Sequence, residues 1–270
     1  MNKKINLDQF ETIAVKTENY TCSIELNRPT IKNAFNDVLI RELASAFRYA
    51  SQADDVRLVV FSGRGDLFCA GGDLNWMQRS INLNRAENLE DTTKLTDMFE
   101  TLNSCTKPVV GLIHGAAIGG GVGLVSICDY VVAETSTVFS LSEVRLGIIP
   151  ACIGPFVLAK IGESHARALF MSAERFKAPR AYEIGLVHEL ATGREGLEAA
   201  KTRIVSNLLQ CGPNAMKAAK ALIAGLRTKQ TDRTNALCYV AEMLADLRVT
   251  PEGQEGLKAF LEKRKPNWII

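Results

Sequence analysis

The sequence predicts an α/β protein whose C-terminal part is helical. Over the first 150 residues, short apolar runs typical of strands alternate with glycine-rich turns and with segments whose apolar residues recur at helical spacing. After Pro150, helical spacing continues through to Lys265. The chain has 270 residues, 47% hydrophobic and 23% charged. This is ordinary for a soluble globular protein and sufficient for a full hydrophobic core without disulfides or metal.

The first sixty residues are predicted to form two strands, a helix and a third strand. The strands cover residues 12–15, 21–26 and 57–62, and the last is a short apolar run typical of a strand buried on both faces. The helix begins at about Asn36, a suitable N-cap. Its apolar residues recur at spacings of three and four: Val38, Leu39, Leu43, Ala46 and Phe47.

The following segments repeat this pattern in a looser form. A glycine-rich turn at 70–72 precedes a polar helix over 89–103, and Pro108 precedes a strand over 109–113. A second glycine-rich turn at 119–121 opens a short apolar helix, and 130–133 is another buried strand. Beyond Pro150 we expect helices over 155–161, 165–171, 178–184, 197–209, 214–226, 233–247 and 251–264. These helices form either a subdomain or an oligomer interface.

Charge and cysteine content exclude several classes of protein. With 32 Lys and Arg against 30 Asp and Glu, the net charge is +2, so we expect no nucleic acid partner. The seven cysteines form no CxxC pair, and no histidine lies at zinc-finger spacing, which favours reduced thiols and no metal site. The N-terminus has no apolar secretion signal, and no stretch is apolar enough to span a membrane. The sequence therefore predicts a cytoplasmic protein with no membrane partner.

Two glycine runs are candidates for binding an anionic oxygen. CAGGD at 69–73 and IGGGVG at 118–123 each follow a predicted strand and precede a predicted helix. Backbone N–H groups at such helix starts lack partners, so two of them aimed at one point would form an oxyanion hole. The alternative is a pair of tight turns where strand and helix pack closely. Neither run fits a nucleotide-type GxGxxG, and the chain has no GxxxxGK[ST].

Glu143 is the main candidate acid/base, because its neighbours in FSLSEVRLGIIP are apolar and would raise its pKa by desolvation. The alternative is a capping or ion-paired glutamate. His114 is another candidate base, although a histidine satisfied at a strand end is the simpler interpretation. Cys69 is interpreted as a buried thiol rather than a nucleophile. Near the C-terminus, Lys263 and its basic neighbours either complement the helix dipole or bind phosphates.

Six segments in order along the chain resemble the crotonase superfamily, also called the enoyl-CoA hydratase/isomerase family. They are LNRPTIKNAFN, FCAGGDL, HGAAIGGG, CDYVVA, SEVRLGIIP and EGLKAFLEKRKP. The resemblance implies a spiral of β-β-α turns over residues 1–200 and a helical region over 201–270 that builds trimers or hexamers. It also implies an acyl-CoA substrate and no separate cofactor, since coenzyme A is part of the substrate.

The resemblance also implies the residues of the site. The N–H groups of Gly72 and Gly120 would hold the thioester oxygen, and Glu143 would be the acid/base. Coenzyme A would be bound by residues from two separate parts of the sequence: Lys32, Ala34, Ala70, Asp73 and Leu74, together with Phe260 and Lys263.

The chain departs from the family pattern at Gly123, where the hydratases have their other catalytic glutamate. The chain most resembles the bacterial 3-methylglutaconyl-CoA hydratases of leucine breakdown and their isohexenylglutaconyl-CoA relatives, which also tend to have glycine at this position. The segments that carry this resemblance are DLNWMQ, GGGVGL, LSEVRLGIIPACIGPFV and EGQEGLKAFLEKRKPNW. The resemblance therefore implies hydration of a branched, carboxylated enoyl-CoA. One hypothesis is that Gly123 leaves space in which the substrate's own carboxylate helps to hold water, and that Arg145 binds this carboxylate unless it forms a surface salt bridge.

Three other functions remain open. A Δ3,Δ2-enoyl-CoA isomerase needs a single carboxylate, which fits Glu143. A catalytically silent acyl-CoA binder is compatible with Gly123. RNA binding, reported for some relatives, would need a basic helical stripe, and the helix from Asn36 offers only Arg41 and Arg48.

Overall fold

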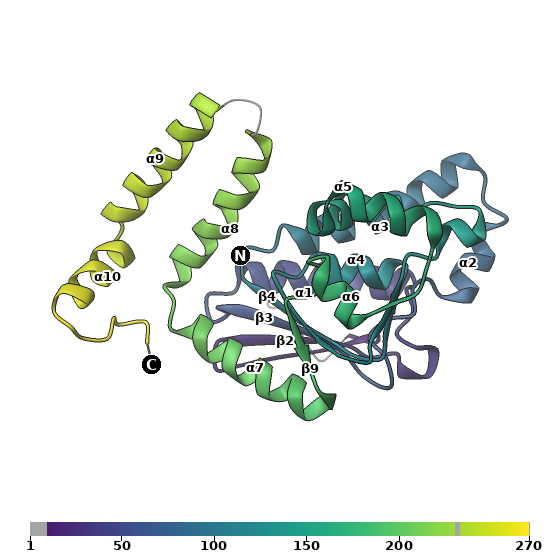
Figure 1. Cartoon of the computed structure of the whole chain (residues 1–270), viewed down its shortest axis with the longest axis horizontal. Helices are drawn as coiled ribbons and strands as arrows, with labels where there is room; N and C mark the ends of the chain where they lie inside the picture. Colours follow the sequence, from purple (N-terminus) through teal and green to yellow (C-terminus); the bar gives the residue numbers. More distant parts are fainter. Residues whose placement is uncertain (1–9, 230–232, 270) are drawn as a thin grey trace.

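The computed structural model describes residues 10–229 and 233–269, and within them nine strands form two sheets (Figure 1). The larger sheet has the order β1-β2-β3-β4-β6-β9, and all of its pairs are parallel except β1–β2. The smaller has the order β5-β7-β8. The strands are β1 Ile13–Glu18, β2 Thr21–Leu26, β3 Leu58–Gly63, β4 Val109–Ile113, β5 Ala116–Ile118, β6 Tyr130–Glu134, β7 Val138–Ser140, β8 Phe176–Lys177 and β9 Glu189–Ala191.

The larger sheet is buried on both faces. Along β3, Val59 and Phe61 belong to the main hydrophobic core, whereas Leu58 and Val60 belong to a second cluster. Helix α7 (Gly193–Leu209) covers the second cluster, and α1 (Asp37–Gln52) and α3 (Arg85–Asn103) pack together over the main core. A strand with both faces covered needs apolar residues at every position, which explains the unbroken apolar run in β3.

Helix α1 begins where the sequence indicates. The Oδ1 atom of Asn36 accepts a hydrogen bond of 2.9 Å from the Leu39 N–H, which caps the first turn. The hairpin between β1 and β2 turns at Asn19 and Tyr20, both with positive φ, as the tight turns of hairpins require.

Several further helical segments of the body are short or kinked. They are α2 (Leu74–Ser80), α4 (Gly120–Ser126), the 3₁₀ turn η3 (Glu143–Leu146), α5 (Gly154–Ser172) and α6 (Ala178–Glu183). Helix α5 is interrupted at Gly162, whose φ is 74°. The kink separates the two segments that the sequence predicts as individual helices.

The last three helices form an arm to one side of the sheets (Figure 1). They are α8 (Pro213–Thr228), α9 (Arg233–Val249) and α10 (Pro251–Leu261). Arg57, only 7% exposed, joins the arm to the body by donating to the carbonyls of Leu209, Cys211 and Trp268. In the described parts of α8 and α9 no residue is buried. Large apolar side chains on the arm are exposed: Ile223, Leu237, Leu244, Leu257, Phe260 and Leu261.

The prediction of an α/β fold with a helical C-terminal region is confirmed. The expected division at residue 200 falls inside α7. Among the described helices, none is long and apolar enough to cross a membrane. Residues 1–9, which contain most of the N-terminal stretch considered for a secretion signal, lie outside the described residues.

Candidate active site

The two glycine-rich turns lie against each other. Cys69 and Ala117 form a parallel bridge, in which the Cys69 carbonyl accepts from the Ile118 N–H at 3.0 Å. A Cβ at Gly71 would lie 3.0 Å from the Ile118 carbonyl oxygen, and a Cβ at Gly121 would lie 2.7 Å from the Cys69 oxygen. The turns approach each other this closely because both positions lack a side chain.

Each turn presents one backbone N–H group that has no acceptor among the described residues. The Gly71 carbonyl accepts from the Phe35 N–H at 2.8 Å, and the Gly72 N–H points the opposite way because the peptide is trans. The Gly119 carbonyl accepts from the Val122 N–H at 2.8 Å within the first turn of α4, so the Gly120 N–H points outward from the start of the helix. The two N–H groups are therefore free to bind an oxygen of a ligand.

Glu143 lies beside the second turn. A Cβ at Gly119 would lie 3.0 Å from its Oε1 atom, and its buried Oε2 atom has no hydrogen-bond partner in the described part of the chain. Its carboxylate forms no ion pair with any described residue. Burial raises the pKa of the Glu143 carboxyl above its usual value, against a smaller opposing effect of its own backbone N–H. The carboxyl is neither a cap nor an ion-pair partner, and it is suited to proton transfer.

The space beside Gly123 is filled, so the hypothesis of a vacant site there is wrong. A Cβ at Gly123 would lie 2.3 Å from Cγ2 of Ile153 and 2.8 Å from Cε1 of Phe99. Both side chains are buried in the main core. Hydrophobic carbon therefore occupies the place where the other glutamate of the hydratases would begin.

Two other candidates have structural roles. His114 is 5% exposed, its Nε2 atom lies 2.9 Å from the Gly65 carbonyl oxygen, and burial lowers its pKa. Burial also raises the pKa of the Cys69 thiol to about 12, and its Sγ donates to the Asn33 carbonyl. A thiol with that pKa is protonated at neutral pH and is a poor nucleophile.

Four of the expected coenzyme A residues meet next to Gly72. The Ala70 N–H donates to the Lys32 carbonyl at 3.0 Å, and Arg28 donates to the Ala34 carbonyl. Arg28 also forms a 3.0 Å ion pair with Asp73, which caps α2 by accepting from its first N–H groups. These contacts fix the loop before α1 against the start of α2.

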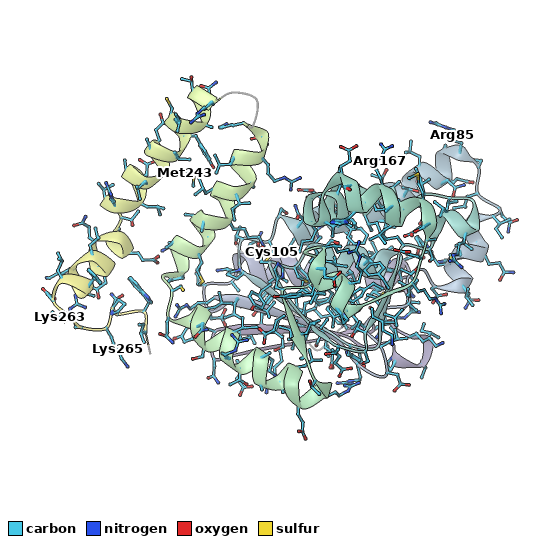
Figure 2. All side chains as sticks on the ribbon, viewed as in Figure 1. Arg85, Cys105, Arg167, Met243, Lys263 and Lys265 are labelled. Carbon is cyan, nitrogen blue, oxygen red and sulfur yellow. The ribbon has the colours of Figure 1, made fainter. Side chains whose placement is uncertain are left out.

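Of the other expected coenzyme A residues, Leu74 lies beside these four, whereas Phe260 and Lys263 do not. Leu74 follows Asp73 at the start of α2 and is 79% exposed. Phe260, 81% exposed, lies on α10, and Lys263 lies just beyond it at the far end of the arm (Figures 1 and 2). Within one copy of the chain these two residues are remote from Leu74.

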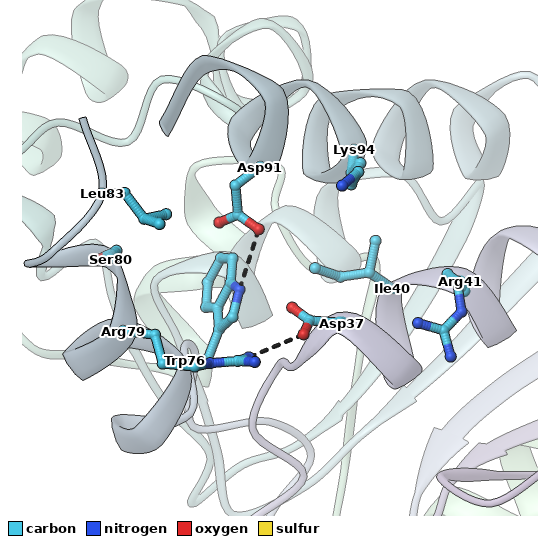
Figure 3. A pocket seen from close by; sticks show the side chains of 9 residues that line it. All are labelled: Asp37, Ile40, Arg41, Trp76, Arg79, Ser80, Leu83, Asp91 and Lys94. Carbon is cyan, nitrogen blue, oxygen red and sulfur yellow. Dashed lines mark hydrogen bonds and ion pairs between the residues drawn. The ribbon is translucent and has the colours of Figure 1, made fainter. Parts of the chain in front are cut away.

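A pocket of about 380 Å³ lies between α1, α2 and α3 (Figure 3). The Trp76 ring lines this pocket and also lies near Gly72, since ring carbon Cε3 is 3.7 Å from the Cβ position of Gly72. On its other side, the Trp76 Nε1 donates to Asp91 at 3.4 Å. Sequence reasoning missed this pocket, although Asp73 as an N-cap followed by an aromatic residue was a usable signal. It is also lined by Asp37, Ile40, Arg41, Arg79, Ser80, Leu83 and Lys94.

Two free N–H groups in adjacent turns, with an unpaired acid beside one of them, are the components of an enzyme that stabilises an enolate. A sequence model described as enoyl-CoA hydratase/isomerase matches residues 16–269. The chain therefore belongs to the enoyl-CoA hydratase/isomerase family, the crotonase superfamily. Acyl-CoA is the substrate class of this family, and the activity it implies is of the enoyl-CoA hydratase type.

Comparison with individual proteins supports the same family assignment. Crotonyl-CoA hydratase of Syntrophomonas wolfei is 32% identical over 96% of this chain and 98% of its own. 2,3-Dehydroadipyl-CoA hydratase of Escherichia coli is 32% identical over 91% and 93%. An enoyl-CoA hydratase structure from Shewanella pealeana superposes with a TM-score of 0.93 at 34% identity, covering 97% of each chain. Pseudomonas aeruginosa AtuE superposes with a TM-score of 0.92 at 33% identity, covering 96% and 100%.

Proposed function

We propose that the chain hydrates a branched enoyl-CoA that carries a free carboxylate at the far end of its acyl chain, with 3-methylglutaconyl-CoA as the leading substrate. The observation that carries the proposal is the Glu143 carboxyl, which is partly buried, unpaired and adjacent to the turn that presents the Gly120 N–H. The same position suits an acid/base that handles protons next to a polarised thioester.

In the proposed mechanism, the thioester oxygen accepts hydrogen bonds from the N–H groups of Gly72 and Gly120. Glu143 takes a proton from water as the water oxygen bonds to C3, and the C2–C3 π electrons move to form an enolate. Negative charge then develops on the thioester oxygen, where the two donors stabilise it more than they stabilise the neutral thioester. Glu143 returns the proton to C2, which restores the thioester and leaves the 3-hydroxyacyl-CoA.

The proposal of a substrate with its own carboxylate is based on Glu143 being the one catalytic carboxyl assigned to the site. Ile153 and Phe99 leave no polar group at Gly123 to hold the attacking water, so the distal carboxylate of the substrate takes that role. Arg145 binds this carboxylate. It lies two residues from Glu143 in η3, it is exposed, and its guanidinium forms no ion pair with any described residue, unlike the surface salt bridge considered from the sequence.

Coenzyme A binding is proposed to require more than one copy of the chain. Lys32, Ala34, Ala70, Asp73 and Leu74 form one side of the coenzyme A site. Phe260 and Lys263 reach that site from the arm of a neighbouring copy. The exposed apolar side chains of the arm support assembly into a homotrimer or homohexamer, since such surfaces mark interfaces between subunits.

A second candidate is an enoyl-CoA isomerase in which Glu143 moves one proton between two carbons. The hydrophobic wall at Gly123, formed by Ile153 and Phe99, favours the isomerase, because isomerisation needs no bound water. A trans-2-decenoyl-[acyl-carrier-protein] isomerase from Streptococcus mutans is 29% identical over 96% of this chain.

Mass spectrometry of a panel of enoyl-CoA substrates decides between these functions. Hydration adds the mass of one water, whereas double-bond migration changes the retention time at constant mass. We expect hydration, fastest with 3-methylglutaconyl-CoA and much slower with crotonyl-CoA. Equal rates on the two substrates would refute the carboxylate requirement, and turnover without a mass change would establish the isomerase. Binding of coenzyme A without turnover of any substrate would identify a non-catalytic binder.

A further inference from the structure

Phe35 contacts both of the turns that present free N–H groups. Its N–H donates to the Gly71 carbonyl at 2.8 Å, and its carbonyl accepts from the Asp73 N–H at 2.9 Å. Its ring lies against the other turn, where ring carbon Cε2 is 2.9 Å from the Cβ position of Gly120. The side chain is 2% exposed. Phe35 therefore binds the Gly71–Gly72 peptide through its backbone and packs against Gly120 with its ring.

We propose that Phe35 is a positioning residue that sets the separation and direction of the Gly72 and Gly120 N–H groups. The inference rests on the proposed function in taking these two groups as the oxyanion hole. It goes further by assigning their alignment to a residue that does not touch the substrate.

The backbone of Phe35 holds the peptide between Gly71 and Gly72. Its carbonyl is held by the Phe35 N–H, and in a trans peptide this fixes the direction of the opposite N–H. The hydrogen bond also polarises the peptide, which makes the Gly72 N–H a stronger donor.

The loop that carries Phe35 is itself anchored. Asn33 is fully buried, and its Nδ2 donates to the carbonyls of Arg64, Leu67 and Phe68 at 2.8–3.1 Å. Its Oδ1 accepts from the Arg28 N–H at 2.9 Å. The hydrogen bonds of Asn33 therefore hold the backbone of the loop in place and resist a displacement of Phe35.

The ring of Phe35 packs against Gly120 at the start of α4. Because Gly120 has no side chain, the ring bears on the backbone of α4 directly. The Phe35 ring packs against Phe99, with centroids 6.0 Å apart, and Phe99 packs against Phe156 at 5.9 Å. These three packed rings support the first turn of α4 and limit its movement toward the core.

Loss of the Phe35 ring should misalign the two donors rather than weaken substrate binding. Misplacement of reacting groups by about 1 Å costs roughly 100-fold in rate, and loss of one oxyanion-hole donor costs about 10²–10³-fold in kcat. We expect Phe35→Ala to lower kcat by about 100-fold and Phe35→Leu by about 10-fold. Neither change should alter KM or the Kd for free coenzyme A by more than about threefold, because the two donors contribute little to binding the neutral thioester and much more to stabilising the charged transition state.

The matched control is Phe47→Leu. Phe47 is also a fully buried phenylalanine and packs edge-to-face on Phe61 at 5.5 Å, but it belongs to α1 and is not among the nearest neighbours of the glycines in either turn. Phe47→Leu should lower the thermal midpoint about as much as Phe35→Leu and leave kcat within twofold. Kinetics use the enoyl-CoA that the wild-type protein turns over fastest.

A spectroscopic measurement separates this inference from the proposed function. Infrared difference spectra with carbonyl-labelled crotonyl-CoA bound to Glu143→Gln report how strongly the donors polarise the thioester, with no turnover required. We expect a lowered carbonyl frequency that moves back toward the free value when Phe35→Leu is added. An unshifted carbonyl in Glu143→Gln itself would refute the oxyanion hole and the proposed function.

A shifted carbonyl that Phe35→Leu leaves unchanged would overturn the role of Phe35 alone. Equal loss of kcat in Phe35→Leu and Phe47→Leu would also overturn it, because a general loss of stability would then explain both. If Phe35→Ala fails to fold, Phe35→Leu carries the test, since it retains a buried side chain of intermediate size.

Discussion

Substitution of Gly123 by alanine tests the packing beneath α4. The added Cβ would lie 2.3 Å from Cγ2 of Ile153 and 2.8 Å from Cε1 of Phe99, whereas nonbonded carbons prefer about 3.5–4.0 Å. Ile153 is 3% exposed and Phe99 is fully buried, so neither side chain has space to move away. The substitution therefore overfills a packed region.

Two opposing effects determine how much Gly123→Ala changes the free energy of unfolding. Overpacking of a core costs about 1–3 kcal/mol, and replacing glycine by alanine in a helix gains up to about 1 kcal/mol in helix propensity. With an overlap of more than an ångström, we expect overpacking to win by roughly 1–2 kcal/mol. For a chain of this size that lowers the thermal midpoint by roughly 2–8 °C.

The assay is a double-mutant cycle with Ile153→Ala, measured by thermal unfolding at fixed protein concentration. Ile153→Ala alone should cost about 2–5 kcal/mol, because it leaves a cavity. In the double variant the new methyl group enters that cavity and its closest contact, Cγ2 of Ile153, is gone. We expect the double variant to be more stable than the sum of the single effects by about 1 kcal/mol or more.

The reasoning is refuted if Gly123→Ala is as stable as the wild-type protein or more stable. Helix propensity would then act without opposition, and the space beside Gly123 would be open after all. Additive effects in the cycle would also refute it, since they would mean that residues 123 and 153 do not touch.

Three further predictions concern the site. Glu143→Gln should lower kcat/KM by about 10²–10⁴-fold. The wild-type activity requires the ionised form of Glu143, and burial raises the pKa of this carboxyl, so activity should be lost as pH falls through a value above 4.5. A pH–activity profile that stays flat down to pH 4.5 would contradict this. Arg145→Ala should raise KM about tenfold for 3-methylglutaconyl-CoA and leave crotonyl-CoA unaffected, whereas equal changes in steady-state kinetics would remove Arg145 from carboxylate binding. Lys263→Ala should weaken coenzyme A binding about tenfold in calorimetry at low salt and less at high salt, and an unchanged affinity would argue against its contact with phosphate.

Segments with a clear period were predictable from the sequence. Strand β2 has the predicted bounds, and α1 begins after the predicted N-cap Asn36. The short strands β5, β7, β8 and β9 were missed because two or three residues show no alternation, and their pairing depends on segments distant in sequence. Helix α2 was missed because it is only seven residues long, too short for a helical period to show, and none of its residues is fully buried.

The candidate site was predictable in its chemistry and not in its packing. The apolar neighbours of Glu143 indicated desolvation, and the direction of its pKa shift agrees. The sequence showed that Gly123 lacks a carboxylate, yet the side chains that fill its place come from 123 − 99 = 24 residues before and 153 − 123 = 30 residues after. Contacts at such separations arise only from the tertiary fold. The double role of Phe35 was hidden for the same reason.

The hydrophobic wall at Gly123 links the single acid to the kind of substrate. Hydration and isomerisation both use an enolate held by the same N–H donors, and they differ in whether a water molecule is held at C3. Ile153 and Phe99 offer that water no hydrogen-bond acceptor. A neutral acyl chain would leave Glu143 to orient the water alone. In the proposed function the substrate's own carboxylate supplies a second acceptor for the water, which is the physical reason to expect crotonyl-CoA to react slowly here.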